Sequence, residues 1–484
     1  MSQPLWTWDE LLRATGGAAE GMAAGGVTGV SIDTRTLQPG DLFVALRGDN
    51  QNGEAFVTKA FEKGAAAALV SKEFVTPANA GPQVRVEDTL KGLEWLGVAA
   101  RARLSADARV IAVTGSVGKT STKEMLWLCL RSVDARTHKS EKSYNNHWGV
   151  PLTLARMPRD TRYGVFEIGM NHAGEITPLT RMVRPHVAVI TTVGPVHLGH
   201  FNSVAEIADA KAEIFAGLEL GGVAVLPFNG LFSNKLKAAV GPNRTTKTFG
   251  ERQLGEDVPQ PDFGGSTMNL SMSGGTRLTV FHGSSQLQIQ IGTIARHQGL
   301  NALAAIAAMQ SVNADIAIAS QAFGEFEAGD GRGATTQYPV ENTQYLLINE
   351  GYNANPISMK AALVSLSDQA MLVASSRRIA VLGDMRELGD ESGRLHRELL
   401  DPVTAAKVDL VFACGPYMRE LFNLLPGATR GTYAEKSTDL IAPLLAAIAP
   451  GDVIMVKGSL GTNMKPIVEA LKAELTRRAG EAQK

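Results

Sequence analysis

Short, continuous apolar runs recur along the chain and constrain its fold more than any other feature. The clearest lie at 110–113, 163–168, 187–193, 345–348, 379–382, 409–414 and 453–456. An unbroken apolar run is typical of a parallel strand that is covered on both faces, whereas a half-exposed strand alternates. Helical stretches separate most of these runs. The sequence therefore predicts doubly wound α/β sheets, whose ligands bind at the carboxyl ends of the strands.

The length of 484 residues favours about three domains. We predict an N-terminal domain over residues 1–106, a central domain over 107–314 and a C-terminal domain over 315–484. The polar, Arg-rich segment 101–109 suggests a hinge between the first two domains. A glycine-rich stretch at 324–333 lies near the start of the third.

Charge and cysteine usage exclude several classes of protein. The formal net charge is −1, so no bulk charge attracts the chain to nucleic acid or to anionic lipid. Two distant cysteines, Cys129 and Cys414, cannot make a disulfide framework or a cysteine-based zinc site. Acidic residues come early, at Asp9 and Glu10, and no run of 18 apolar residues occurs. We predict a soluble, cytoplasmic protein.

A glycine loop between a strand and a helix predicts a phosphate site. The segment Thr114-Gly115-Ser116-Val117-Gly118-Lys119-Thr120 follows the apolar run at 110–113 and precedes a helical stretch. Glycines let backbone N–H groups approach phosphates, and the positive end of a helix dipole favours anions. Lys119 would contact the terminal phosphates and Thr120 would bind Mg²⁺. Because Val113 replaces the first glycine of the general pattern, the loop is a shortened variant, and a chance Gly-Lys-Thr is the alternative.

Two candidate metal ligands follow neighbouring predicted strands. Glu167 ends the run at 163–168, and His197 lies in the loop after 187–193. Both would reach the crevice beside the phosphate loop, where a carboxylate and an imidazole could hold Mg²⁺. The alternatives are a Glu paired with a basic residue and a His bonded to backbone. Lys211 lies in a helical stretch, where an exposed lysine is the default.

The motifs together resemble one family. Residues 114–120, 143–151, 167–170 with 174–176, and 196–198 resemble the ATP-dependent Mur ligases of peptidoglycan synthesis. Two later segments, 351–359 and 381–389 with His396, resemble the branch that adds D-alanyl-D-alanine. The resemblance implies an N-terminal α/β domain that binds the UDP end of the substrate, a central P-loop ATPase domain and a C-terminal Rossmann-like domain. It spans the whole chain.

The resemblance also implies a reaction. ATP would phosphorylate the C-terminal carboxylate of UDP-N-acetylmuramoyl tripeptide, and the amine of D-alanyl-D-alanine would displace phosphate from the acyl phosphate to form the pentapeptide. The enzyme would be a monomer that uses ATP and two Mg²⁺ ions. By the same resemblance Glu167, His197 and Lys211 are magnesium ligands, with Lys211 as a carbamate, which requires a neutral amine.

Further site residues come from the resemblance. Asn301 corresponds to the position that reads adenine, and Arg332 to a third-domain arginine that approaches the phosphates. The expected catalytic residues are Lys119, Lys211, His197 and Arg332. The expected nucleotide contacts are Gly115, Ser116, Val117, Gly118, Lys119, Thr120, Ser121, Asn301, Arg332, Glu350, Tyr352 and Asn355. The expected contacts to the UDP-sugar substrate are Ser31, Thr34, Arg35, Asn145 and Asn146.

Some positions depart from the family pattern. Asn349-Glu350-Gly351 stands where Asp-Asp-Ser is common, Asn52-Gly53-Glu54 replaces Asp-Gly-His, and Leu460 replaces an Arg. Four alternatives stay open. They are the preceding Mur ligase, which typically has an Asp-Asn-Pro-Arg segment, a folylpolyglutamate synthetase, a P-loop small-molecule kinase, and a non-catalytic nucleotide-binding switch.

Overall fold

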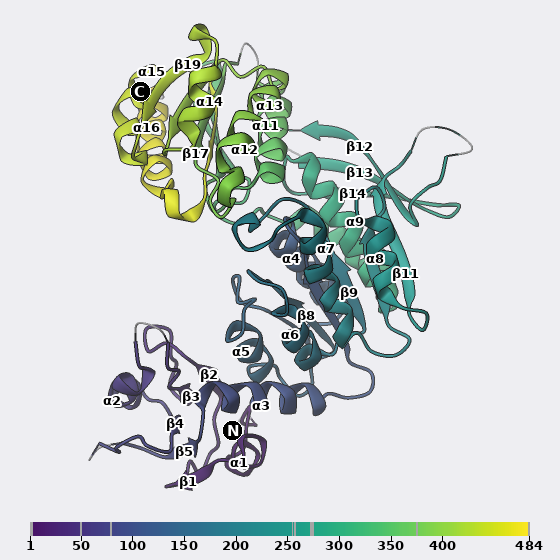
Figure 1. The fold of residues 1–484 in the computed structure, drawn as a ribbon, viewed down its shortest axis with the longest axis vertical. Helices are drawn as coiled ribbons and strands as arrows, with labels where there is room; N and C mark the ends of the chain where they lie inside the picture. Colours follow the sequence, from purple (N-terminus) through teal and green to yellow (C-terminus); the bar gives the residue numbers. More distant parts are fainter. Residues whose placement is uncertain are drawn as a thin grey trace.

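The protein consists of three α/β domains in a row, each built on its own sheet (Figure 1). The computed structural model describes residues 3–48, 51–77, 80–253, 255, 258–271, 275–373 and 376–482. The predicted boundaries at 106 and 314 fall outside every described helix and strand. The predicted three-domain α/β fold is confirmed.

The first sheet has the strand order β1-β5-β4-β3-β2, and only β1 runs antiparallel. Its apolar residues alternate between two helical layers, since Leu42 and Leu69 pack with α3, whereas Phe43 and Val70 pack with α2. Both faces are therefore covered. The elements are α1 (Trp8–Thr15), β1 (Ala18–Glu20), β2 (Gly29–Ser31), β3 (Asp41–Val44), α2 (Val57–Glu62), β4 (Ala67–Ser71), β5 (Gln83–Val86) and α3 (Thr89–Ala102).

The second sheet is the largest, with the order β14-β13-β12-β11-β10-β9-β6-β8-β7. Neighbouring strands are parallel from β7 to β12, and β12–β14 form an antiparallel extension. The strands are β6 (Arg109–Thr114), β7 (Thr137–Lys139), β8 (Tyr163–Glu167), β9 (Val187–Ile190), β10 (Val223–Pro227), β11 (Thr245–Glu251), β12 (Phe263–Ser271), β13 (Gly275–His282) and β14 (Ser285–Ile291).

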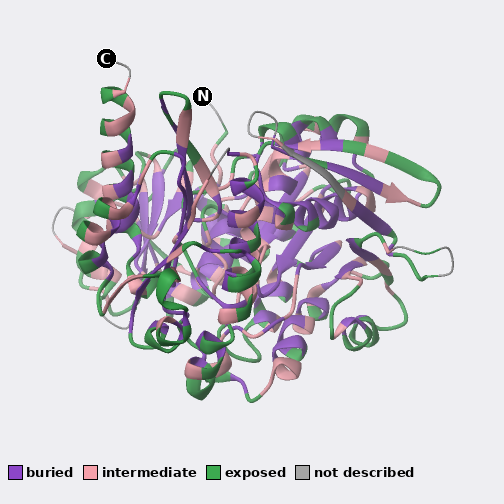
Figure 2. Cartoon of the chain, turned by 90° about the horizontal axis from the view of Figure 1, so that it is seen from above, coloured by how far each residue is buried: buried purple, intermediate pink, exposed green. Residues whose placement is uncertain are grey.

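Helices cover both faces of this second sheet. Helices α4 and α9 pack on Ile111 and Val113, and helices α5, α6 and α7 pack on the face of Val110 and Ala112. The central strands β6, β8 and β9 are almost entirely buried, whereas β14 at the edge of the sheet and the outer helix faces carry exposed residues (Figure 2). The helices are α4 (Lys119–Val133), α5 (Gly149–Ala155), α6 (Ile176–Val183), α7 (Val204–Ala212), α8 (Ser233–Val240), α9 (Arg296–Ser311) and the short α10 (Ile316–Ala319).

The third sheet has the order β15-β16-β20-β17-β18-β19 and is parallel except for β15. Helices α11–α14 cover one face, and α15 and α16 cover the other. Among the described residues, no helix is long and apolar enough to cross a bilayer. The elements are β15 (Ala334–Val340), β16 (Thr343–Glu350), α11 (Pro356–Ala370), β17 (Arg378–Gly383), α12 (Ser392–Arg397), α13 (Leu400–Ala405), β18 (Leu410–Cys414), α14 (Met418–Leu424), β19 (Arg430–Ala434), α15 (Ile441–Ala447), β20 (Val453–Lys457) and α16 (Lys465–Glu481).

The first two domains share one hydrophobic core. Leu93 and Leu96 of α3 belong to the same buried cluster as Leu152 and Leu154 of α5. The Trp6 indole donates to the Ala155 carbonyl at 2.8 Å. Cores that are continuous across a domain boundary oppose independent motion of the two domains.

The segment 101–109, which was expected to be a hinge, is bound to the central domain by hydrogen bonds. Arg101 is buried, and its guanidinium donates to the carbonyls of Val183 and Arg184, at 2.8 Å each, in the central domain. Arg103 donates both to the Leu5 carbonyl of the first domain, at 2.8 Å, and to the Met157 carbonyl of the central domain, at 2.9 Å, so it links the two domains. The expectation of a hinge at 101–109 is therefore wrong.

Candidate active site

The phosphate loop joins β6 to α4 in the predicted strand, loop and helix order. Gly118 is the N-cap of α4, with a φ of 86°. A Cβ at this position would lie 2.3 Å from Asn301 Oδ1, so both the backbone conformation and the space require glycine. Lys119 Nζ donates to the Gly115 carbonyl at 2.7 Å, which folds the lysine over the loop. The loop thus presents backbone N–H groups and a cation to an anion.

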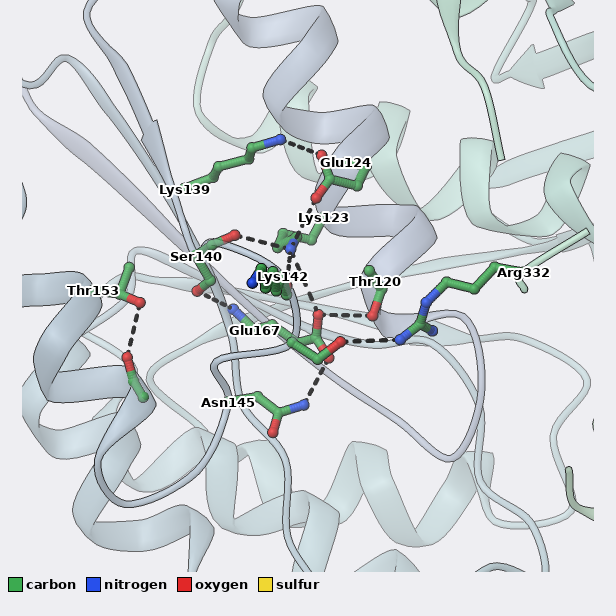
Figure 3. Close-up of polar contacts among 12 residues, drawn as sticks. Thr120, Lys123, Glu124, Lys139, Ser140, Lys142, Asn145, Thr153, Glu167 and Arg332 are labelled. Carbon is green, nitrogen blue, oxygen red and sulfur yellow. Dashed lines mark hydrogen bonds and ion pairs between the residues drawn. The ribbon is translucent and has the colours of Figure 1, made fainter. Parts of the chain in front are cut away.

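Glu167 ends β8, the neighbour of β6, and lies against the phosphate loop as predicted (Figure 3). Its carboxylate is almost fully buried. One oxygen accepts from the Thr120 hydroxyl at 2.9 Å, and the other accepts from Asn145 Nδ2 at 2.7 Å. Two predicted metal ligands, Thr120 and Glu167, are therefore in direct contact.

His197 connects the central domain to the third domain. Its Nδ1 lies 2.6 Å from Oε2 of Glu387, which follows β17. This hydrogen bond lowers the pKa of the Glu387 carboxyl, although burial opposes the shift. Nε2 of His197 makes no hydrogen bond to any residue that the structure describes. A carboxylate on one ring nitrogen of a histidine leaves the other available to a metal.

Lys211 is buried in α7 rather than exposed, so the default expectation for a helical lysine is wrong here. Only 2% of the residue is accessible, and its ammonium makes no hydrogen bond or ion pair within the described residues. Burial, together with the charge of Lys119, holds the pKa of the Lys211 amine well below its usual range. A neutral amine is what carbamate formation requires.

A cavity of about 950 Å³ lies between the central and third domains. Gly115 and Lys211 lie outside its lining. The other residues expected around the nucleotide and the metal all line it, namely Ser116, Val117, Gly118, Lys119, Thr120, Ser121, Glu167, His197, Asn301, Arg332, Glu350, Tyr352 and Asn355, together with Asn145 and Asn146.

The third domain contributes Arg332 to this cavity. Its Nη2 donates to the Ser143 hydroxyl at 3.0 Å, and its guanidinium lies 4.0 Å from the centroid of the Tyr352 ring. Burial lowers the pKa of the Lys119 amine, the negative charge of Glu167 raises it, and the positive charge of Arg332 lowers it. The net shift of this pKa is downward. Arg332 and Lys119 therefore act on the same small volume from two domains.

Several predicted side chains already have partners within the protein. Glu350 Oε2 lies 3.3 Å from Lys457 Nζ. Asn355 caps α11 by accepting from the Ser358 N–H at 2.9 Å. Asn301 Nδ2 donates to Gln298 Oε1 at 2.8 Å. The cap gives Asn355 a structural role in addition to its place on the cavity wall.

Sequence reasoning missed some of the cavity wall. Ser143, His297, Gln298 and Lys457 line the cavity, and Glu387 holds His197. Lys457 had a signal, because it ends the apolar run at 453–456 and so falls at the carboxyl end of a parallel strand. Ser143 and Glu387 lie within two of the segments that carry the family resemblance, 143–151 and 381–389, but the resemblance gave neither of them a role of its own. His297 and Gln298 lie at the start of α9, next to the motif around Asn301.

A second cavity, of about 910 Å³, lies between the first two domains. Thr34 and Arg35, two of the residues expected to contact the UDP-sugar, line it together with Arg47, Lys59 and Trp148. Ser31 does not line it, and its hydroxyl donates to the Asp33 carbonyl at 3.1 Å. His147 lines both cavities, so the two adjoin.

The residues around Glu167 fit a hard cation. The carboxylate and the Thr120 hydroxyl in contact with it, together with the His197 imidazole on the same cavity wall, supply oxygen and nitrogen donors, and the amine of Lys211 has no hydrogen-bond partner among the described residues. Within the described ranges no three His, Cys, Asp or Glu side chains form a metal cluster. A divalent cation here would complete its shell with phosphate oxygens, as Mg²⁺ does at nucleotide sites.

Comparison with known proteins identifies the family. Three family models match, namely the Mur ligase middle domain over 113–309, the Mur ligase glutamate ligase domain over 340–460, and the catalytic domain of the Mur ligase family over 26–104. The chain is 33% identical over 449 residues to the UDP-N-acetylmuramoyl-tripeptide–D-alanyl-D-alanine ligase of Bacillus subtilis, covering 92% of this chain and 93% of that protein. This chain belongs to the Mur ligase family.

Other Mur ligases agree. The protein with the same name from Escherichia coli is 33% identical over 446 residues, covering 92% and 93% of the two chains. The crystal structure of MurF from Acinetobacter baumannii superposes with a TM-score of 0.81 at 28% identity and covers 98% of this chain and 99% of its own. Escherichia coli FolC shares the fold alone, with a TM-score of 0.57 at 15% identity over 79% of this chain and 92% of its own.

Proposed function

We propose that this Mur ligase joins the C-terminal carboxylate of UDP-N-acetylmuramoyl tripeptide to the amine of D-alanyl-D-alanine at the expense of ATP. The relatives from Bacillus subtilis and Escherichia coli described above carry these two substrates in their names. The observation that carries the proposal is that His147 lines both cavities. A long sugar nucleotide can hold its UDP end in the cavity with Thr34 and Arg35 while its peptide carboxylate reaches the phosphate loop.

ATP occupies the larger cavity in this proposal. The phosphate loop and Lys119 bind the phosphates, Asn301 contacts adenine, and Arg332 approaches from the third domain. The MurF of Thermotoga maritima, whose structure contains ADP, shares the fold with a TM-score of 0.76 at 23% identity, over 93% of this chain and 98% of its own.

Mg²⁺, as two ions, would be held by Thr120, Glu167, His197 and a carbamate on Lys211. Carbamate formation would convert the buried amine of Lys211 into an anionic oxygen donor, and its negative charge would be attracted to Lys119. When bound, Mg²⁺ supplies positive charge that offsets the phosphate oxygens.

The chemistry uses two steps. The peptide carboxylate attacks the γ-phosphorus of ATP, and the bond from that phosphorus to the β,γ-bridging oxygen breaks. ADP departs, and the peptide carboxylate is now an acyl phosphate. The amine of D-alanyl-D-alanine then attacks the carbonyl carbon, and phosphate departs as the amide forms. Lys119 and Arg332 neutralise charge on the transferring phosphoryl group from fixed positions, so that little reorganisation is needed in the transition state.

We further propose that the enzyme works in the cytoplasm as a monomer. Cys129 and Cys414 are free and buried, which fits a reducing compartment. Both the sugar-nucleotide cavity and the ATP cavity are built from one chain, so that no second copy is needed to complete them.

Phosphate release separates this function from its alternatives. We expect release only when ATP, UDP-N-acetylmuramoyl tripeptide and D-alanyl-D-alanine are all present, with one pentapeptide formed per phosphate. Replacing the dipeptide by a diamino acid or by glutamate should abolish product, which excludes the related ligases. ADP formation that does not depend on the amine would indicate a kinase, and slow turnover under all conditions would indicate a switch.

A further inference from the structure

A second lysine of α4, Lys123, is fully buried one helical turn after Lys119. Its ammonium donates to the carbonyls of Ser140 and Lys142, at 2.9 and 2.5 Å (Figure 3). It also lies 2.9 Å from Glu124 Oε1 and 3.9 Å from Glu167 Oε2. A fully buried ammonium is costly unless all its donors are used, as they are here.

The two carbonyls belong to a loop that we name the 140–145 segment, between β7 and α5. Its start is fixed because the Ser140 N–H donates to the Val165 carbonyl at 3.0 Å and the Ser140 hydroxyl accepts from the Glu167 N–H at 3.1 Å. Its end is fixed because the Gly169 N–H donates to the Asn145 carbonyl at 2.8 Å. Lys123 holds the part between these two points.

The 140–145 segment carries two side chains that face the reaction site. Asn145 donates to Glu167, and the Ser143 hydroxyl receives Arg332 from the third domain. Tyr352, also from the third domain, lies 3.4 Å from the same Ser143 hydroxyl. The segment therefore supports Glu167, the expected metal ligand, and also contacts the third domain through Ser143.

We propose that Lys123 is a positioning residue that ties the 140–145 segment to α4, the helix after the phosphate loop. With the segment held there, Asn145 orients Glu167, and Ser143 receives Arg332 at a fixed position beside the phosphate loop. This rests on the ligase reaction proposed above. One ammonium links three parts of the site whose positions must agree, namely the phosphate loop, the carboxylate at the end of β8 and the arginine of the third domain.

The lysine is chosen for charge as well as for its hydrogen bonds. Glu124 and Glu167 lie on either side of it, and Lys139 contacts the far side of Glu124. The charges of Lys123 and Lys139 lower the pKa of the Glu124 carboxyl, against the effect of burial. A neutral donor at Lys123 would leave two neighbouring carboxylates without this cation.

The test compares Lys123→Met with Lys139→Met. Both remove one positive charge beside Glu124, but Lys139 contacts Glu124 and the Trp127 ring and holds no carbonyl of the 140–145 segment. Since a misplacement of about 1 Å can cost about 100-fold in rate, we expect kcat of Lys123→Met to fall by at least about 30-fold. KM of Lys123→Met for the sugar nucleotide should stay within about twofold of the wild-type value, because the second cavity is untouched. The control Lys139→Met should keep kcat within about twofold of the wild-type value.

Amide hydrogen exchange, measured without ligands, reports the tether directly. In Lys123→Met the amides of Tyr144 and Gly169 should exchange about tenfold faster, and those of the distant third sheet should not change. Lys123→Arg keeps the charge and donors and should recover most of the lost kcat. If Lys123→Met does not fold, Glu124→Gln weakens one contact of the ammonium and should lower kcat by about threefold or more at constant KM.

Three results would overturn the proposal. They are an unchanged kcat in a folded Lys123→Met, a rise in KM that accounts for the whole loss, or equal losses in the two lysine variants. If the wild-type protein forms no pentapeptide, the ligase function fails by itself, and the exchange rates still decide whether Lys123 holds the segment.

Discussion

Lys119 is the cation that the central domain places directly on the phosphate loop. Among the described residues its ammonium bonds only to the Gly115 carbonyl, so a bound phosphate could replace that neutral partner with a charged one. We expect Lys119→Ala to lower kcat by at least about 100-fold, since one preorganised group facing developing charge is worth about that much. Circular dichroism should show an unchanged fold. Turnover near the wild-type rate in a folded variant would remove the loop from the mechanism.

Lys211 provides a second test of the site. If it becomes a carbamate, Lys211→Met should lower activity by about 100-fold, and acetate or formate should restore part of it by returning an anionic oxygen. Assays under saturating ATP and Mg²⁺ measure this, with Lys235→Met in α8 as the control, because Lys235 lies at the surface in an ion pair with Asp209. Equal activity of Lys211→Met and wild type would make the buried lysine catalytically irrelevant.

The same lysine makes folding stability depend on pH in a defined direction. The unfolded amine keeps its proton up to about pH 10.4, whereas the folded protein loses it at lower pH. In that interval the unfolded state binds more protons, so the free energy of unfolding rises with pH. The free energy of unfolding of Lys211→Met should therefore exceed that of the wild type by the largest amount at low pH. This difference between the two proteins should shrink toward pH 10. Urea unfolding in CO₂-free buffer from pH 6 to 10 measures it, and a constant difference would contradict the depressed pKa.

Residue burial was the hardest property to predict from sequence. Lys211 lies in a helix whose neighbours Ala208, Ala210 and Ala212 leave room for another element to cover it, and no local pattern reveals that cover. Lys123 likewise bonds to residues 17 and 19 positions away. In contrast, Glu167 and Thr120 could be placed together, because the carboxyl ends of neighbouring parallel strands share one edge of a sheet.

At the scale of elements, the contact between α3 and α5 decides how the first two domains combine. A Cβ at Gly97 would lie 3.2 Å from both Leu154 Cβ and the Pro151 carbonyl oxygen, so the two helices approach without a side chain between them. Gly97→Val should destabilise the protein by about 1–3 kcal/mol through overpacking. Val98→Ala, on the exposed side of the same helix, should change the free energy of unfolding by less than about 0.5 kcal/mol. Urea unfolding compares them, and equal effects would mean that the helices can separate at little cost.

The elements themselves divide into predictable and unpredictable groups. The seven apolar runs all became parallel strands, because burial on both faces leaves an unbroken apolar signature. The antiparallel strands β12–β14 were not identified. In β13 the exposed Arg277 lies among buried residues, and β14 begins with exposed residues. A strand with one wet face carries a weaker signal, and its pairing depends on the rest of the sheet.

At the scale of the molecule, the third domain touches the central domain at two separate places. Arg296 Nε lies 2.6 Å from Asp368 Oδ2, and the Gln369 amide donates to the Ile294 carbonyl at 2.8 Å. On the side of the site, the contacts include those of Arg332 with Ser143 and of Glu387 with His197. We expect the first pair to act as the pivot and the second pair to form and break.

Small-angle scattering tests this motion. The protein with an ATP analogue and the sugar nucleotide both bound should have a smaller radius of gyration than the protein without ligands, since both Arg332 and Lys119 must approach the same phosphates. Glu387→Ala should reduce the change by removing one contact of the closed state. Mass from the same curves should correspond to one chain. An identical radius under all ligand conditions would show that closure is not required.

The shared core of the first two domains also sets an order on synthesis. The apolar face of α3 is complete once residue 102 has been made, but Leu152 and Leu154, which cover it, come about 50 residues later. At 5–20 residues per second the ribosome takes about 3–10 s to supply them. During that interval the nascent N-terminal domain carries an uncovered hydrophobic surface, which is the kind of surface that chaperones bind. An N-terminal fragment ending near residue 106 would keep that surface permanently, so we expect it to aggregate when expressed alone.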